Sequence, residues 1–411
     1  MKYFVLASRL VGGIVFIFSG FVKGIDPVGS QIKFGDYVTA MGLSLPDSLL
    51  LTAAMILCAA EFLIGISLIT GSFYRAGVIS YLVFMALFTP LTLVLAIFNP
   101  VSDCGCFGDA IHLTNWETFY KNIVLLILGV VMLMYAKKYS PAAMMSRSVT
   151  IMTVSTLMFS AFMLYAVRYE PLIDFRPYRV GTNIPDAMAF PEGAEHDVYD
   201  ISLLYEKEGV VKEFTLNNYP ANDSSWVFVD QKSVLLKKGY EPPIRDFNIT
   251  TVDGRDLTNL VLYDRGYTLL FISHKLGKAR SKDIEKGVVT GFNCVTNGMQ
   301  FFILTSSIRS EIEAFQNGLT FCVADETLLK TIVRSNPGYL LIRDGTIIGK
   351  WSAAGVPAPD WFSGNITAEI IKESRQRGSA ITIGIFILTS LIIYWGARRL
   401  LSNINKKQTR K

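Results

Sequence analysis

The sequence has few cysteines, few histidines and few charged residues for its length. Of 411 residues, five are cysteine, three are histidine and 18% are Asp, Glu, Lys or Arg. Five cysteines do not make a disulfide framework, and three scattered histidines argue against a multi-histidine metal centre. Hydrophobic residues make up 51% of the chain, and the mean hydropathy is +0.38. This composition excludes an ordinary water-soluble protein and indicates a membrane protein with a soluble part.

Positive charge is concentrated at the C-terminal end of the sequence. The formal net charge is +5, and the densest basic cluster runs from Arg398-Arg399 to Arg410-Lys411, directly after an apolar run. Basic residues in that position are typical of a membrane flank rather than of a nucleic-acid surface. We therefore expect a lipid bilayer as the environment and no nucleic-acid partner.

Several apolar runs are long enough to cross a bilayer, which takes about 20 residues. They lie at 3–22, 49–70, 74–98, 116–136, 147–167 and 380–397. A cleaved signal peptide is the alternative for the first run, because Lys2 precedes it, but Arg9 interrupts it and no clear small-residue cleavage site follows. We predict an uncleaved span, and six spans place both ends on the same side.

The basic residues of the short flanks predict the orientation. One set of flanks holds Lys2, Arg75, Lys137, Lys138, Arg147 and the basic tail, whereas the opposite short loops hold only Lys23 and Lys33. By the positive-inside rule both termini are cytoplasmic, and the long segment 168–379 faces outward. In a bacterium this describes a multi-pass inner-membrane protein with a periplasmic soluble part, in a compartment that permits disulfides.

Hydropathy and spacing divide the chain into segments. The first four spans, within 1–140, have short connections and predict a four-helix membrane bundle. The others are a fifth span at 147–167, a small β-rich module at 175–240, an α/β domain at 243–375, a sixth span at 380–397 and a cytoplasmic tail at 398–411.

Two soluble patterns support this division. Alternating residues at 198–205 and 210–216, with a turn between them, predict a hairpin. Farther on, strands at 267–273, 300–305, 320–324, 338–343 and 346–351 are interleaved with helices near 278–296, 307–317 and 325–335. This alternation predicts a sheet with parallel strands.

Residues 243–352 resemble thioredoxin-like domains of the peroxiredoxin and periplasmic thiol-reductase type. The resemblance rests on Ile244-Arg245-Asp246-Phe247, the Val252-Asp253-Gly254 turn, the strand 269–272, Asn336-Pro337 at the cis-proline position and the hairpin 344–351. It implies a Cys-x-x-Cys after the first strand, but Ser273-His274-Lys275-Leu276-Gly277-Lys278 stands there. We therefore expect no thiol chemistry at that position and an exposed His274. Cys294 and Cys322 are either buried free thiols or partners in a disulfide.

The first 140 residues resemble DoxX-like membrane proteins and, more closely, the methylamine utilisation protein MauE. The matching features are Arg9 with Gly12-Gly13, the run 18–23, Glu61 with Gly65, and Cys104-Gly105-Cys106-Phe107-Gly108. The MauE resemblance implies a role in maturing disulfide-rich periplasmic proteins. DoxX relatives are associated with quinone-linked sulfur oxidation, which makes a quinone the one cofactor to consider.

Cys104 and Cys106 are close enough for a disulfide in a very small ring, and Gly105 removes a side-chain obstacle to closing it. A strained disulfide is readily attacked by a thiol. Two alternatives stay open: a metal site completed by His112 and by Asp103 or Asp109, and a purely structural turn. Cys58 is either an ordinary buried cysteine or a relaying thiol.

Arg9 and Glu61 are polar residues within predicted spans, where such residues are costly. Their depths are compatible with a mutual ion pair, either structural or proton-handling. The sequence thus predicts a thiol–disulfide redox protein with Cys104, Cys106, Glu61 and Arg9 as site residues, no metal, and an envelope protein as partner. The alternative is a non-catalytic scaffold that binds an envelope protein, which leaves open whether the chain is an enzyme.

Overall fold

The computed structural model describes residues 1–99, 105–139, 144–221, 223–237, 239–315 and 318–372. The chain forms two compact units, of which one comprises Thr182–Phe247 and the other comprises the chain before and after it. The predicted span at 380–397 and the basic tail at 398–411 lie outside the described residues.

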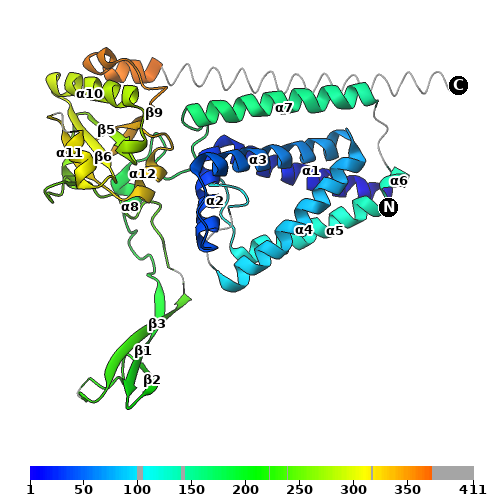
Figure 1. Ribbon diagram of the computed structural model, residues 1–411, viewed down its shortest axis with the longest axis horizontal. Coiled ribbons are helices and arrows are strands. Elements are labelled where there is room, and N and C mark those ends of the chain that lie inside the picture. Colours follow the sequence, from blue (N-terminus) through cyan, green and yellow to red (C-terminus); the bar gives the residue numbers. More distant parts are fainter. Residues whose placement is uncertain (100–104, 140–143, 222, 238, 316–317, 373–411) are drawn as a thin grey trace. The chain divides into compact units, whose positions relative to one another are not determined.

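Within the described residues, five helices are long and apolar enough to cross a membrane (Figure 1). They are α1 (Lys2–Ile25), α3 (Asp47–Thr70), α4 (Tyr74–Phe98), α5 (Asn115–Met134) and α7 (Met145–Arg168). Five predicted spans are thereby confirmed, and the protein is a multi-pass membrane protein. Large apolar side chains such as Ile56, Leu87 and Leu157 are 65–66% exposed, as expected for helices that face lipid.

Helices α1 and α3 pack against each other at very short range. A Cβ atom added to Gly20 would lie 2.7 Å from the carbonyl oxygen of Cys58, and one added to Gly65 would lie 2.7 Å from that of Gly13. Small residues that let two backbones approach are typical of helix packing in membranes. This close packing places Ser19 of α1 beside Glu61 of α3.

Two shorter helices complete this part of the chain. Helix α2 (Pro27–Ala40) follows α1 directly, and the side chain of Asp26 caps it by accepting a hydrogen bond from Gly29 N at 2.8 Å. Helix α6 (Ala136–Tyr139) is a single turn after α5.

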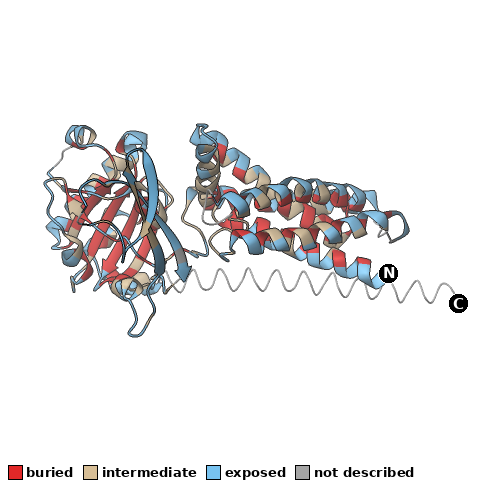
Figure 2. Ribbon diagram, turned by 90° about the horizontal axis from the view of Figure 1, so that it is seen from below, coloured by how far each residue is buried: buried red, intermediate tan, exposed pale blue. Residues whose placement is uncertain are grey.

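The chain from Asn248 to the last described residue, here called the α/β domain, is built on a six-stranded sheet of order β4-β7-β6-β5-β8-β9. The strands are β4 (Thr250–Thr251), β5 (Thr268–Ser273), β6 (Gln300–Thr305), β7 (Thr320–Val323), β8 (Gly338–Arg343) and β9 (Thr346–Ser352). Strands β5, β6 and β7 are mutually parallel, whereas β8 runs antiparallel to β5 and to β9. All six residues of β5 are buried, which marks the centre of the domain core (Figure 2).

Helices lie between these strands as the sequence predicts. They are α9 (Thr258–Leu262), α10 (Ser281–Thr296), α11 (Arg309–Ala314) and α12 (Glu326–Ile332), with 3-10 turns η1 (Leu276–Lys278) and η2 (Pro359–Ser363). The five predicted strands are confirmed to within a residue at either end. The Asn336–Pro337 peptide bond is cis.

The other unit contains α8 (Ile184–Met188) and a three-stranded antiparallel sheet of order β2-β1-β3. The strands are β1 (Val198–Lys207), β2 (Val210–Thr215) and β3 (Val227–Lys237). Glu208 and Gly209 make the turn between β1 and β2 with φ angles of 52° and 79°, which suits a tight hairpin. The predicted hairpin is confirmed.

Candidate functional site

A cavity of about 110 Å³ lies among the membrane helices at the ends that adjoin Cys106. Side chains of α1 to α5, the segment 105–109 and the segment after α7 form its wall, and the wall is apolar over most of its area. The apolar lining comprises Val15, Phe16, Phe84, Met85, Phe88, Leu91, Leu95 and Leu125. Polar groups meet at one side of it, where Ser19, Lys23, Glu61 and Cys106 all line the cavity.

A buried ion pair forms the centre of this polar side. Lys23 Nζ lies 2.5 Å from Glu61 Oε1, and the two residues are 8% and 7% exposed. Ser19, one turn before Lys23, has its hydroxyl oxygen 2.8 Å from Glu61 Oε2 and 2.8 Å from the carbonyl oxygen of Cys106. The Ser19 hydroxyl has one hydrogen and can donate it to either acceptor, so it lies between the ion pair and the cysteine segment and links them.

Residues 105–109, here called the cysteine loop, form a tight turn against the cavity. Gly108 N donates to the carbonyl oxygen of Gly105 at 3.0 Å, and both glycines have positive φ angles, 64° and 54°. A side chain at either position would strain this backbone. Phe107 is buried, and Lys121 Nζ lies 4.3 Å from the centre of its ring. Cys106 is half-buried in the cavity wall, whereas Cys104 lies outside the described residues.

Cys58 is a buried free thiol on α3, one turn before Glu61. Lys23, Glu61 and Cys106 line the same cavity, and Cys58 lies one turn away from Glu61 on α3. This geometry keeps the relay hypothesis for Cys58 open.

The predicted ion pair between Arg9 and Glu61 is wrong. Arg9 Nη2 instead donates to the carbonyl oxygen of Leu68 at 2.9 Å, and the guanidinium carbon lies 4.8 Å from the centre of the Tyr74 ring. The antiparallel register of α1 and α3 is the reason, because it places Lys23 level with Glu61 and Arg9 near the C-terminal end of α3. A cation is favourable at a helix C-terminus.

Sequence reasoning missed Lys23 as a site residue because it treated this lysine as part of a loop. The structure instead continues α1 to Ile25, so Lys23 stands in the last turn of the helix. A signal was present, since Ser19 and Lys23 are four residues apart and share a helix face. A carboxylate in a membrane span also needs a cationic partner.

The expectation of an exposed His274 is also wrong. His274 is 6% exposed, and its Nε2 lies 2.9 Å from the carbonyl oxygen of Val333. The segment after β5 is held down by hydrogen bonds, from Ser273 Oγ to Asn336 Oδ1 at 2.8 Å and from Asn336 Nδ2 to the carbonyl oxygen of Lys275 at 2.9 Å. Burial lowers the pKa of His274 to about 4.

His274 makes the stability of the α/β domain depend on pH. Its pKa is about 4 when folded, against an ordinary value of 6.5, so the folded state resists protonation. The stabilisation is complete above pH 6.5 and is lost as the pH falls toward 4. We expect urea unfolding, followed by tryptophan fluorescence in detergent, to show a loss of about 2–3 kcal/mol between pH 7 and pH 4.5 that His274→Asn lacks. Equal pH slopes for the two proteins would contradict this assignment.

Cys294 and Cys322 are free and fully buried, so the free-thiol alternative is confirmed. Burial raises the pKa of each thiol to about 12, which makes both unreactive. Among the described residues, no group of three or more His, Cys, Asp or Glu side chains could hold a metal. Asp103 and Cys104, which the metal alternative requires, lie outside those residues.

Residues 1–135 match the family model described as methylamine utilisation protein MauE. Residues 199–238 match a domain of unknown function, DUF8463. No curated protein and no solved structure matches the chain. The MauE match includes the helices α1, α3, α4 and α5 and the cysteine loop, so the whole polar side of the cavity lies within the matched residues.

Proposed function

We propose that this protein is a thiol–disulfide redox protein of the bacterial inner membrane, in which Cys104 and Cys106 form the redox pair. One observation carries the proposal: the Ser19 hydroxyl joins the carbonyl oxygen of Cys106 to the buried pair of Lys23 and Glu61 at the edge of an apolar cavity. A buried ion pair is costly in a membrane, and a structural turn alone does not need one. The match to MauE supports the same reading.

The proposed reaction transfers two electrons and two protons. A client cysteine thiolate attacks one sulfur of the Cys104–Cys106 disulfide and forms a mixed disulfide, while the other cysteine leaves as a thiolate. The second client thiolate then attacks the client's sulfur in the mixed disulfide, which leaves a client disulfide and a reduced pair. The Lys23 ammonium group stabilises a thiolate formed at Cys106. The Glu61 carboxylate and the Ser19 hydroxyl are placed to accept and pass on a proton from the cysteine loop.

We infer that a quinone is the acceptor that reoxidises the pair. The apolar wall of the cavity suits a ring with a hydrophobic tail, and Lys23 offers N–H donors beyond the one that faces Glu61 Oε1. A bound quinone would supply an acceptor for two electrons and two protons. The protein's residues would hold it, exclude water and keep a cation beside it.

The α/β domain would then act outside the membrane as a docking module of thioredoxin-like fold. The strand order β6-β5-β8-β9, with β5 and β6 parallel and β8 antiparallel, supports this fold. Ser273 and His274 stand where such a fold carries its thiols, so the module would bind a client without reacting with it. The short basic flanks support cytoplasmic termini and a periplasmic position for this domain.

Trapping of mixed disulfides tests the proposal. With either Cys104 or Cys106 replaced by serine, the remaining thiolate can attack a client disulfide, which is the reverse of the proposed step and releases one client thiolate. The neighbouring thiol that would release the client is then missing, so the mixed disulfide should persist. We expect thiol-reducible adducts on non-reducing gels from at least one single variant. The double variant, which keeps Cys58, Cys294 and Cys322, should give none. The same adducts from the double variant would overturn the proposal and favour the scaffold alternative.

A further inference from the structure

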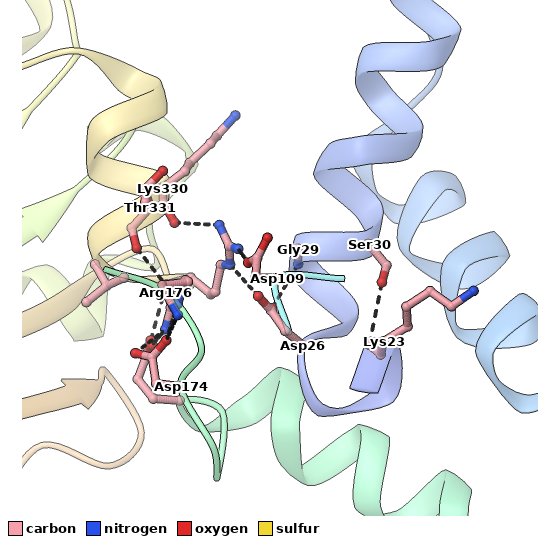
Figure 3. A network of polar contacts seen from close by, with 12 residues as sticks. Lys23, Asp26, Gly29, Ser30, Asp109, Asp174, Arg176, Lys330 and Thr331 are labelled. Atoms are coloured by element: carbon pink, nitrogen blue, oxygen red, sulfur yellow. Dashed lines mark hydrogen bonds and ion pairs between the residues drawn. The ribbon is translucent and has the colours of Figure 1, made fainter. Parts of the chain in front are cut away.

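Arg334 of the α/β domain contacts the membrane domain at the cysteine loop. Its Nη2 lies 3.0 Å from Asp109 Oδ2, and its Nε lies 2.7 Å from Asp26 Oδ2. The third nitrogen, Nη1, donates to the carbonyl oxygen of Lys330 at 2.9 Å. Figure 3 shows Asp26 and Asp109 together on the membrane side of this network, facing Lys330 and Arg176. The Arg334 side chain is only 10% exposed, so the contact is shielded from solvent.

The two carboxylates belong to two different walls of the cavity. Asp109 ends the cysteine loop, three residues after Cys106. Asp26 caps α2, and Ser30, Lys33 and Phe34 of that helix line the same cavity. Burial opposes ionisation of Asp26, but the Arg334 and Arg176 guanidinium groups outweigh it and hold the pKa of its carboxyl below its usual range. One guanidinium group therefore fixes both the loop and the start of α2.

Residues of the segment that follows α7 hold Arg334 in place. Glu170 Oε1 accepts a hydrogen bond from the backbone N of Arg334 at 3.3 Å. Arg176, which is 3% exposed, binds Glu170 at 2.9 Å and Asp174 at 2.7 Å. Lys350 of β9 binds Asp174 at 2.7 Å. Ion pairs, together with the hydrogen bond from the Arg334 backbone N to Glu170, thus connect β9 to the cysteine loop.

Networks of this kind specify an arrangement more than they add stability. Desolvation of the charges offsets much of their attraction, but removing one member leaves the others uncompensated. Arginine suits the task because its planar fork can bind two carboxylates at once, which a lysine does less well. The geometry of Arg334 thus favours a role in holding the loop in one position.

We propose that Arg334 is a positioning residue of the redox site, through which the α/β domain sets the placement of Cys106. The inference rests on the proposed function and deepens it, because it makes the α/β domain part of the site. Arg334 touches no reacting atom. It acts through Asp109 and Asp26, so its loss changes the exposure and reactivity of the Cys106 thiol and leaves the chemistry of that thiol otherwise intact.

The test compares two ion pairs that both join the α/β domain to the membrane domain. Arg334→Gln removes the contact with the cysteine loop, whereas the control Lys278→Gln removes the exposed pair with Asp47, which is 2.9 Å long and does not touch the loop. After reduction of the full-length protein in detergent, alkylation of the loop peptide is followed over time by mass spectrometry. We expect about tenfold faster alkylation in Arg334→Gln, the factor for one lost charge-assisted hydrogen bond. Lys278→Gln should stay within about twofold of wild type, because exposed pairs contribute little.

Two further variants test the same contact between Arg334 and the cysteine loop. Arg334→Lys should lie between wild type and Arg334→Gln, because it keeps the charge and loses the fork. Asp109→Asn leaves the α/β domain untouched and should also accelerate alkylation, even if Arg334→Gln folds poorly. Wild-type rates in both Arg334→Gln and Asp109→Asn would overturn the inference. Absence of mixed disulfides would defeat the proposed function instead, since alkylation of a reduced thiol requires no redox partner.

Discussion

A Lys23→Met variant is expected to lose about 3–5 kcal/mol of stability, the usual cost of removing one partner from a buried ion pair. Glu61 would remain 7% exposed among membrane helices with no cation at 2.5 Å, and Ser19 could satisfy only one of its two oxygens. The loss should appear as a large fall in the thermal unfolding midpoint in detergent. Redox turnover should fall with it, because Lys23 and Cys106 line the same cavity in the proposed site.

The double variant Lys23→Met, Glu61→Gln shows whether the loss of stability comes from breaking the ion pair or from losing the lysine side chain itself. Replacing both charges leaves no uncompensated ion, so much of the lost stability should return, while redox turnover should stay low. Lys121→Met is the matched control, since this lysine also lines the cavity but lies over the ring of Phe107 rather than beside a carboxylate. A double variant as unstable as Lys23→Met would show that Glu61 does not depend on Lys23.

Replacement of Cys104 or Cys106 by serine is expected to abolish activity in an envelope-disulfide assay, down to the level of cells that lack the protein. A disulfide needs both sulfurs, so each single variant and the double variant should be equally inactive. The loss should occur without a change in the amount of protein in the membrane. Wild-type activity in these variants would rule out a redox function of the two cysteines and favour the purely structural turn.

The remaining cysteines provide the controls. Cys294→Ser and Cys322→Ser should keep full activity, because these thiols are buried in the α/β domain. Cys58→Ser decides between the two readings of that residue. Full activity identifies an ordinary buried cysteine, whereas a loss comparable to that of Cys106→Ser identifies a relay.

Local patterns in the sequence predicted most of the fold. The described spans follow from apolar length alone, because a bilayer demands about 20 apolar residues per helix whatever the tertiary contacts are. Strands such as β5 and β8 follow from short apolar runs bounded by turns, and the hairpin at Glu208 and Gly209 follows from its turn residues. Each of these signals lies within one element.

The partners of the charged residues depended on the register between elements. The sequence offered Arg9 as the partner of Glu61, and only the packing of α1 on α3 shows that Lys23 takes that place. His274 was expected to be exposed because nothing in its own segment indicates that its ring contacts the carbonyl oxygen of Val333, far along the chain. The contact between Arg334 and Asp109 spans even more of the sequence and leaves no local pattern.

Cys104 and Cys106 are proposed to be a redox pair that a quinone in the cavity reoxidises. The most direct test is the redox state of these two cysteines in respiring cells, trapped with an alkylating mass tag before and after respiration is blocked. We expect a disulfide between Cys104 and Cys106 in respiring cells and its conversion to two thiols when the quinone pool becomes reduced. A redox state that stays the same under both conditions would contradict this proposal.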